Sequence, residues 1–174
     1  MNKIINIYLE QSDKARLANR RIRLVRDEGR REPQYDMDLV FVHDFKTNEI
    51  PDDAIYSWTF YSPQNDPIHF YTTAERCKEM VSPDPSYWTK EKLAAIAKIE
   101  EKLYTHWDRG EVYGYIVEEW DETQRKWKFI DRSWGMYGEK ALFDNLPYKD
   151  GDIVCCAENL KYNFENVEMK VNSF

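Results

Sequence analysis

The residue types best suited to binding chemistry are the basic ones that crowd a short stretch near the start of the chain. Residues 14–31 include five arginines at roughly helical spacing, Arg16, Arg20, Arg23, Arg26 and Arg30. Guanidinium groups on one face can each donate two parallel hydrogen bonds to a phosphate, which gives salt-sensitive binding of nucleic acid. Ion pairs with carboxylates of the same chain are the alternative role for these arginines, and the sequence leaves both open.

A second candidate set combines aromatic side chains with acidic ones. Large aromatic residues act as anchors in protein interfaces, and carboxylates steer them toward a positively charged partner. Such a surface could occupy a basic groove that otherwise holds a nucleic-acid strand, although an ordinary solvated surface would have the same composition. The residues that we assign to partner binding are Trp58, Tyr61, Trp88, Glu118, Glu119 and Trp120.

A third candidate lies around the aromatic and glycine-rich stretch of residues 133–138, Ser-Trp-Gly-Met-Tyr-Gly, for which we predict a tight turn. A turn at the end of a hairpin could expose Asp131, Arg132, Trp134 and Tyr137. A cleft there with carboxylates of strongly shifted pKa would point to a small enzyme.

No other pattern indicates catalysis. The histidines His43, His69 and His106 lack the spacing of metal ligands, and the chain has neither a Gly-x-Ser-x-Gly elbow nor a glycine-rich phosphate loop. Cys155 and Cys156 lie in an apolar run, where a cysteine acts as a small buried hydrophobe. We therefore expect no catalytic residues, no metal and no cofactor.

The elements that would position the arginines can be read in two ways. Ser12 is a helix N-cap residue, and apolar side chains between residues 15 and 25 fall on one broad helical face opposite the arginines. This pattern favours an amphipathic basic helix that ends near Gly29. The run Arg21-Ile22-Arg23-Leu24 also alternates with a period of two, so a strand that pairs beyond the 27–29 turn is the alternative.

The other elements follow from periodicity and turn residues. Residues 3–9 are expected to form a short strand, and residues 37–45 and 55–61 a strand pair. Thr89 caps a helix over residues 90–107, and residues 112–120 and 126–131 flank a hairpin loop. We predict an α+β fold in a single domain over residues 1–174: a small antiparallel sheet with an N-terminal basic helix and a central amphipathic helix packed on it.

The composition limits the classes of protein and the cellular compartments that fit this chain. The formal net charge is -7, and 42% of the residues are hydrophobic, which is enough to build a core. Residues 13–32 hold eight basic and four acidic residues, so the rest of the chain carries -11. Three cysteines cannot form an even disulfide framework, and no run approaches the ~18 apolar residues of a membrane span. We expect a cytoplasmic protein that does not bind membranes.

One module of the chain resembles a known group of proteins. The stretches Gly-Glu-Val-Tyr-Gly-Tyr at residues 110–115 and Asp-Arg-Ser-Trp-Gly-Met-Tyr-Gly at residues 131–138 resemble a module in small uncharacterised proteins of bacteriophages and mobile elements. In that module a helix precedes a Gly-acidic-Val-Tyr-Gly strand, and a second strand ends in Asp-Ser-Cys-Trp-Gly-Phe-Tyr-Gly. The resemblance covers residues 95–140. Arg132-Ser133 replaces Ser-Cys, so no thiol function carries over.

The resemblance implies an accessory protein of a phage or mobile element in the bacterial host cytoplasm. Small acidic proteins of that origin often inhibit host defence, as anti-CRISPR and anti-restriction proteins do. We therefore expect a non-enzymatic inhibitor whose partner is a bacterial protein or ribonucleoprotein complex that targets nucleic acid. The alternatives are a nucleic-acid-binding protein that uses the arginine-rich segment 14–31 and a small enzyme with its site at the 131–138 turn.

Overall fold

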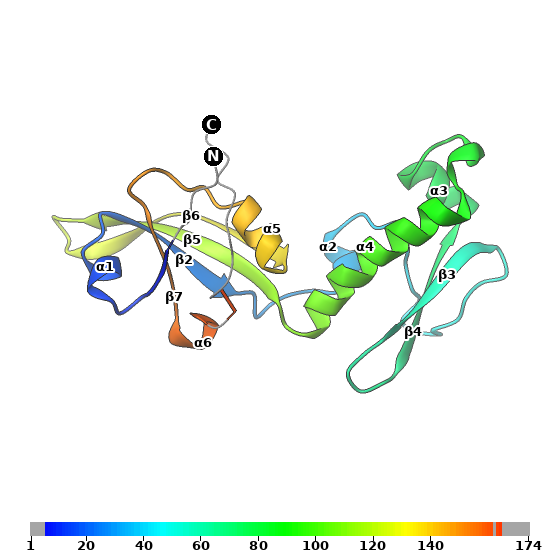
Figure 1. Cartoon of the computed structure of the whole chain (residues 1–174), viewed down its shortest axis with the longest axis horizontal. Helices are drawn as coiled ribbons and strands as arrows, with labels where there is room; N and C mark the ends of the chain where they lie inside the picture. Colours follow the sequence, from blue (N-terminus) through cyan, green and yellow to red (C-terminus); the bar gives the residue numbers. More distant parts are fainter. Residues whose placement is uncertain (1–5, 162, 165–174) are drawn as a thin grey trace. The chain divides into compact units, whose positions relative to one another are not determined.

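The computed structural model describes residues 6–161, 163 and 164, and the chain divides into two compact units (Figure 1). The first unit comprises Met1–Arg30 and Gly110–Phe174, and the second comprises Arg31–Arg109. Each unit is described by itself below. The expectation of a single domain over residues 1–174 stays a prediction, because compactness does not show whether two units unfold together.

The first unit is built on a five-stranded sheet with the order β1-β7-β2-β5-β6. Its strands are β1 (Ile7–Leu9), β2 (Arg20–Arg26), β5 (Val112–Asp121), β6 (Lys126–Tyr137) and β7 (Ile153–Cys156). Its helices are α1 (Asp13–Arg16), α5 (Glu139–Asp144) and α6 (Glu158–Lys161). Strand β7 runs parallel to both β1 and β2, whereas β2, β5 and β6 pair antiparallel. The α+β class is confirmed, and the sheet is mixed where an antiparallel one was predicted.

The predicted N-terminal basic helix is wrong. Ser12 does cap a helix, since its Oγ accepts a hydrogen bond from Ala15 N at 3.3 Å, but α1 ends at Arg16. Residues 20–26 form β2, in which Ile22 and Leu24 are fully buried at alternate positions. The period of two decided the outcome, because pairing with β5 and β7 on both sides outweighs the helix propensity of arginine and leucine.

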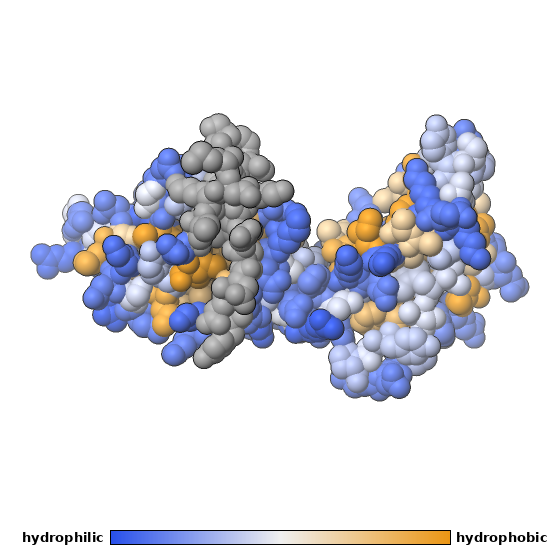
Figure 2. All heavy atoms as spheres, viewed as in Figure 1, coloured by the Kyte–Doolittle hydropathy of each residue, from blue (hydrophilic) through white to orange (hydrophobic). Residues whose placement is uncertain are grey.

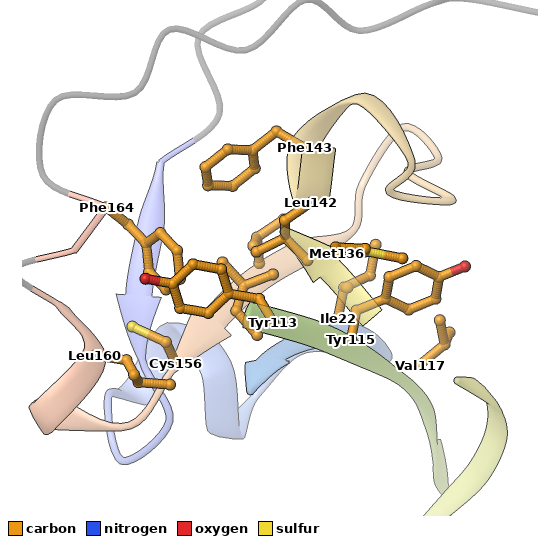
Figure 3. Packing of buried hydrophobic residues seen from close by; sticks show 12 residues of the cluster. Ile22, Tyr113, Tyr115, Val117, Met136, Leu142, Phe143, Cys156, Leu160 and Phe164 are labelled. Carbon is orange, nitrogen blue, oxygen red and sulfur yellow. The ribbon is translucent and has the colours of Figure 1, made fainter. Parts of the chain in front are cut away.

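One face of this sheet carries the hydrophobic core of the first unit (Figure 3). Ile22 and Leu24 from β2 pack there with Tyr113, Tyr115 and Val117 from β5. Helices α5 and α6 cover this face with Leu142, Phe143 and Leu160, and Phe164 packs there as well. Each fully buried side chain of this size contributes about 1.5–3 kcal/mol.

The second unit packs helices on a two-stranded ribbon. The ribbon pairs β3 (Ala54–Tyr61) antiparallel with β4 (Pro67–Thr73). The helical elements are α2 (Pro33–Asp36), α3 (Ala74–Met80), a 3-10 turn (Pro85–Tyr87) and α4 (Lys90–Asp108). Helix α4 confirms the helix predicted at residues 90–107, and Thr89 caps it as expected. Helix α4 packs on β3, so the sheet that this helix covers is the β3–β4 ribbon.

The strand predicted at residues 37–45 is wrong. Only Val42 in this segment forms a bridge, with Tyr71, and β3 pairs with β4. The physical reason is a side chain from α4: the carboxylate of Glu100 accepts hydrogen bonds from the backbone N–H groups of Val40 (2.7 Å) and Phe41 (2.9 Å). A carboxylate thus satisfies the backbone donors that a neighbouring strand would otherwise satisfy.

Candidate binding face on the five-stranded sheet

Opposite the core of the first unit, the sheet has a second face, which we call the outer face. Its members follow from the strand register, because directly opposed residues and residues two apart on one strand share a face. Glu118 on β5 lies opposite Arg21 on β2 and Phe129 on β6, and Trp120 lies opposite Trp127. The charged and aromatic residues of the outer face include Arg21, Arg23, Glu118, Trp120, Trp127, Phe129, Arg132 and Trp134.

An ion-pair network occupies the middle of the outer face. One carboxylate oxygen of Glu118 lies 2.8 Å from Nε and Nη2 of Arg21 and 3.0 Å from Nε of Arg23. A guanidinium nitrogen of Arg23 also lies 3.5 Å from the carboxylate of Glu10. The Glu118 side chain is only 13% exposed. This network holds both guanidinium groups in place and partly neutralises them.

Aromatic rings surround this network and remain accessible. The guanidinium carbon of Arg21 lies 3.9 Å from the ring centroid of Trp127, and the rings of Trp127 and Trp120 meet edge to face at 5.5 Å. Arg132 lies over the ring of Phe129 at 6.0 Å. Phe129 is 56% exposed and Trp134 is 41% exposed. Hydrophobic side chains at the surface of this unit are visible among hydrophilic ones in Figure 2.

Two irregularities in the β5–β6 pairing shape this surface. The register shifts between Tyr113 and Tyr115 and again between Val117 and Glu118, and each shift places one extra residue on β6. At the first shift Gly135 adopts a positive φ of 72°, which side chains disfavour. Such bulges change the direction of nearby side chains, here that of the neighbouring Trp134.

Gly114 provides the space that Trp134 fills. A Cβ atom at position 114 would lie 2.4 Å from Cε3 of the Trp134 ring and 2.4 Å from the carbonyl oxygen of Ser133. Only glycine avoids both clashes, so Trp134 packs directly on the backbone of β5. The glycine and tryptophan of the sequence module are therefore one packing unit.

The predicted arginine set does not share a face. Arg16 is exposed on α1, and Arg23 alone of the five belongs to the outer face. Arg20 and Arg26 point to the other side of β2, where Arg20 pairs with Asp152 and lies 3.7 Å from Glu119. Arg30 follows the strand and lies beside Gly110. The two-residue period of a strand separates side chains that a helix would have gathered.

The predicted partner-binding set divides between the units. Trp58 stacks on Phe70 in the core of the second unit with ring centroids 4.3 Å apart. Trp88 packs against the same core and donates a hydrogen bond from Nε1 to the carbonyl oxygen of Ser82 at 2.8 Å. Tyr61 is 63% exposed at the end of β3.

In the first unit, Glu118 and Trp120 join the outer face, and Glu119 points to the opposite side of β5. The predicted 131–138 turn is wrong, because strand β6 continues to Tyr137. Arg132 and Trp134 belong to the outer face. Asp131 pairs opposite Val117 on the other side of the sheet, whereas Tyr137 pairs opposite Val112 on the side of Gly114 but is buried.

Sequence reasoning missed Arg21, Trp127 and Phe129 as members of the site. The signal was present, because Trp127 and Phe129 are two residues apart in a predicted strand and face the Glu118–Trp120 side of the hairpin. The outer face thus brings together members of all three predicted sets that had seemed independent.

A second polar cluster is buried in the second unit. Nε2 of His43 contacts Oε1 of Glu32, and the hydroxyl of Tyr104 donates a hydrogen bond to the same oxygen at 3.2 Å. Burial and the nearby Glu32 carboxylate raise the pKa of Tyr104 far above its usual range, so this tyrosine stays neutral. Within residues 6–161, 163 and 164, no group of three His, Cys, Asp or Glu side chains is placed to hold a metal ion.

No protein family model, curated protein or solved structure matches this chain. The resemblance to phage and mobile-element proteins therefore stays a prediction. The structure does place the two halves of the module side by side: Val112 pairs with Tyr137, and Gly138 N–H donates to the carbonyl oxygen of Glu111 at 2.8 Å. In this chain, the two stretches of the module belong to the β5–β6 hairpin, which carries much of the outer face.

Proposed function

We propose that this chain is a non-enzymatic binding protein and that the outer face is its contact surface. The observation that carries the proposal is the exposure of Phe129 and Trp134 on one face, where Gly114 and the neighbouring bulge hold Trp134 in place. Tryptophan and arginine side chains dominate the binding energy of protein interfaces, and both gather here. Because Gly114 and the ion pairs already order these groups, binding loses little side-chain entropy.

The edge of the sheet favours contact through side chains over addition of a strand. Strand β6 lies at the end of the sheet order, which would offer backbone groups to an incoming strand. Its two irregularities and the charges of Lys126, Lys128 and Arg132 disfavour such pairing. The partner is therefore expected to cover the rings on the face of the sheet.

For the identity of the partner we keep the inference from the sequence module. The proposed partner is a bacterial protein or ribonucleoprotein complex that targets nucleic acid, which the chain would inhibit in the host cytoplasm. No helix in the part of the chain that the structure describes is long and apolar enough to cross a membrane. A catalytic role for residues 131–138 is not proposed, because Asp131 lies on the other side of β6 and Tyr137 is buried, so the strand does not expose them together with Arg132 and Trp134.

An affinity capture with matched variants tests the proposal. Tagged full-length protein is incubated with bacterial lysate, with and without nuclease and at two salt concentrations, and bound components are identified by mass spectrometry. The expected result is a component retained by the wild type and by Ile99→Ala but lost with Phe129→Ala. Ile99 is a suitable control because it is 63% exposed on α4. Equal capture by all three proteins would refute the outer face as the contact surface.

A further inference from the structure

We infer that the outer face binds a single strand of nucleic acid, whose bases stack on its rings and whose phosphates contact its arginines. The inference rests on the proposed function, since it names the chemistry of the ligand at the same face. It differs from binding by the arginine segment alone, because Arg20 and Arg23 are engaged by Asp152, Glu118 and Glu10. The rings are the primary contact and the arginines are secondary.

The spacing of the rings suits unpaired bases. Trp127 and Phe129 are two residues apart on one strand and share a face, so their Cα atoms are about 7 Å apart. Trp134 follows on the same strand and the same face. An open sheet face with aromatic side chains is a common platform for single strands, because every base offers a π-face for stacking. Paired bases in a duplex do not offer these faces.

The exposed positive charge of the outer face lies beside its rings. Arg21, Arg23 and Arg132 lie on this face with three carboxylates, so the formal charges balance. The carboxylates are those of Glu118, Glu10 and Asp27, and Asp27 accepts a hydrogen bond from Gly135 N–H beside Trp134 at 3.2 Å. Arg132 is exposed beside the Phe129 ring, where a phosphate next to a stacked base would lie. Arg21 stacks on Trp127 while its nitrogens point to Glu118, an arrangement that fixes the guanidinium plane.

A binding measurement with full-length protein tests the inference directly. Fluorescence anisotropy is recorded with fluorescein-labelled single strands of about 16 nucleotides, oligo-dT and oligo-U, and with a DNA duplex of equal length. Single strands should bind more tightly than the duplex. Phe129→Ala should weaken binding at least about fivefold, whereas Phe129→Trp should restore it and Ile99→Ala should leave it unchanged. Because Glu118 and Glu10 engage Arg21 and Arg23, the log–log slope of affinity against salt should lie between about -0.7, for contact by Arg132, and about -2, for contact by all three arginines.

Several results of this measurement would overturn the inference. They are the absence of binding to single strands, equal binding of the duplex, and equal affinity of Phe129→Ala and wild type. Circular dichroism and urea unfolding of the same variants show that a loss of affinity is not a loss of fold. Phe129 is more than half exposed, so its truncation should lower the free energy of unfolding by only about 1 kcal/mol.

Photo-crosslinking in cells separates this inference from the proposed function. A benzophenone-bearing phenylalanine is placed at position 129 and, as the control, at position 99. An adduct at position 129 that nuclease shortens supports both proposals. An adduct with a protein only overturns the nucleic-acid inference and leaves the proposed contact surface standing. No adduct at position 129 beyond that at position 99 overturns both.

Discussion

Replacement of Gly114 by alanine should destabilise the first unit and displace Trp134. The added Cβ would lie 2.4 Å from the indole ring and 2.4 Å from the carbonyl oxygen of Ser133, so at least one of them must move. The backbone oxygen is held in the β5–β6 pairing, and the ring therefore moves first. Overpacking of this kind costs about 1–3 kcal/mol. Urea unfolding followed by circular dichroism measures the cost, and tryptophan fluorescence reports the ring.

A matched control is available at Gly29. A Cβ there would meet only Oδ1 of Asp27 at 3.7 Å, an ordinary contact, so Gly29→Ala should change stability by less than about 0.5 kcal/mol. Truncation of Trp134 in the Gly114→Ala background should recover part of the loss, because the ring clash disappears and the Ser133 clash remains. If Gly114→Ala unfolds at the wild-type urea concentration with unchanged fluorescence, the packing argument is refuted.

Three further predictions concern buried groups. Burial raises the pKa of Glu100, so the stability that this side chain contributes is complete below the unfolded value of 4.5 and declines as the pH rises through the folded pKa. Glu100→Gln should therefore lower the free energy of unfolding, measured in urea, more at about pH 4 than at about pH 7. A larger loss at pH 7 would contradict this sign. Burial raises the pKa of Cys155 to about 12 and that of Cys156 to about 11, so neither thiol should react with a chromogenic disulfide at about pH 8 until urea unfolds the protein. Glu118→Gln should lower the unfolding free energy by about 1–3 kcal/mol, because Arg21 loses its charged partner, and wild-type stability would show that the network is not stabilising.

Local signals predicted the elements whose stability is mostly local. Helix α4 could be predicted because Thr89 caps it and its apolar positions repeat at helical spacing over nineteen residues. The β5–β6 hairpin could be predicted because its strands are adjacent in sequence. Strand β2 was mistaken for a helix because its partners, β5 and β7, lie about a hundred or more residues along the chain, where no local pattern records them.

The site was predictable in its residue types but not in its assembly. Arg23, Glu118 and Trp134 were each recognised, but in three different candidate sets, because their proximity depends on the register of β2 on β5 and of β5 on β6. The register of two strands depends on where bulges lie and on which face is buried. An alternating pattern of polar and apolar residues does not fix the register to within one residue. The same limit explains why Glu100 was not expected to bind the backbone of the 37–45 segment.

Net charge is a poor guide to what the outer face binds. The net charge of -7 argues against a wholesale nucleic-acid binder, but it is unevenly divided. The second unit has nine basic and fifteen acidic residues, a net -6, whereas the first has sixteen and seventeen, a net -1. At physiological salt, exposed charges beyond about 8 Å are largely screened, so a ligand on the outer face responds to the groups within that range. There three arginines are matched by three carboxylates, so the local charge does not repel a phosphate backbone as the net charge of the chain would, and the exposed rings add an attraction that salt does not screen.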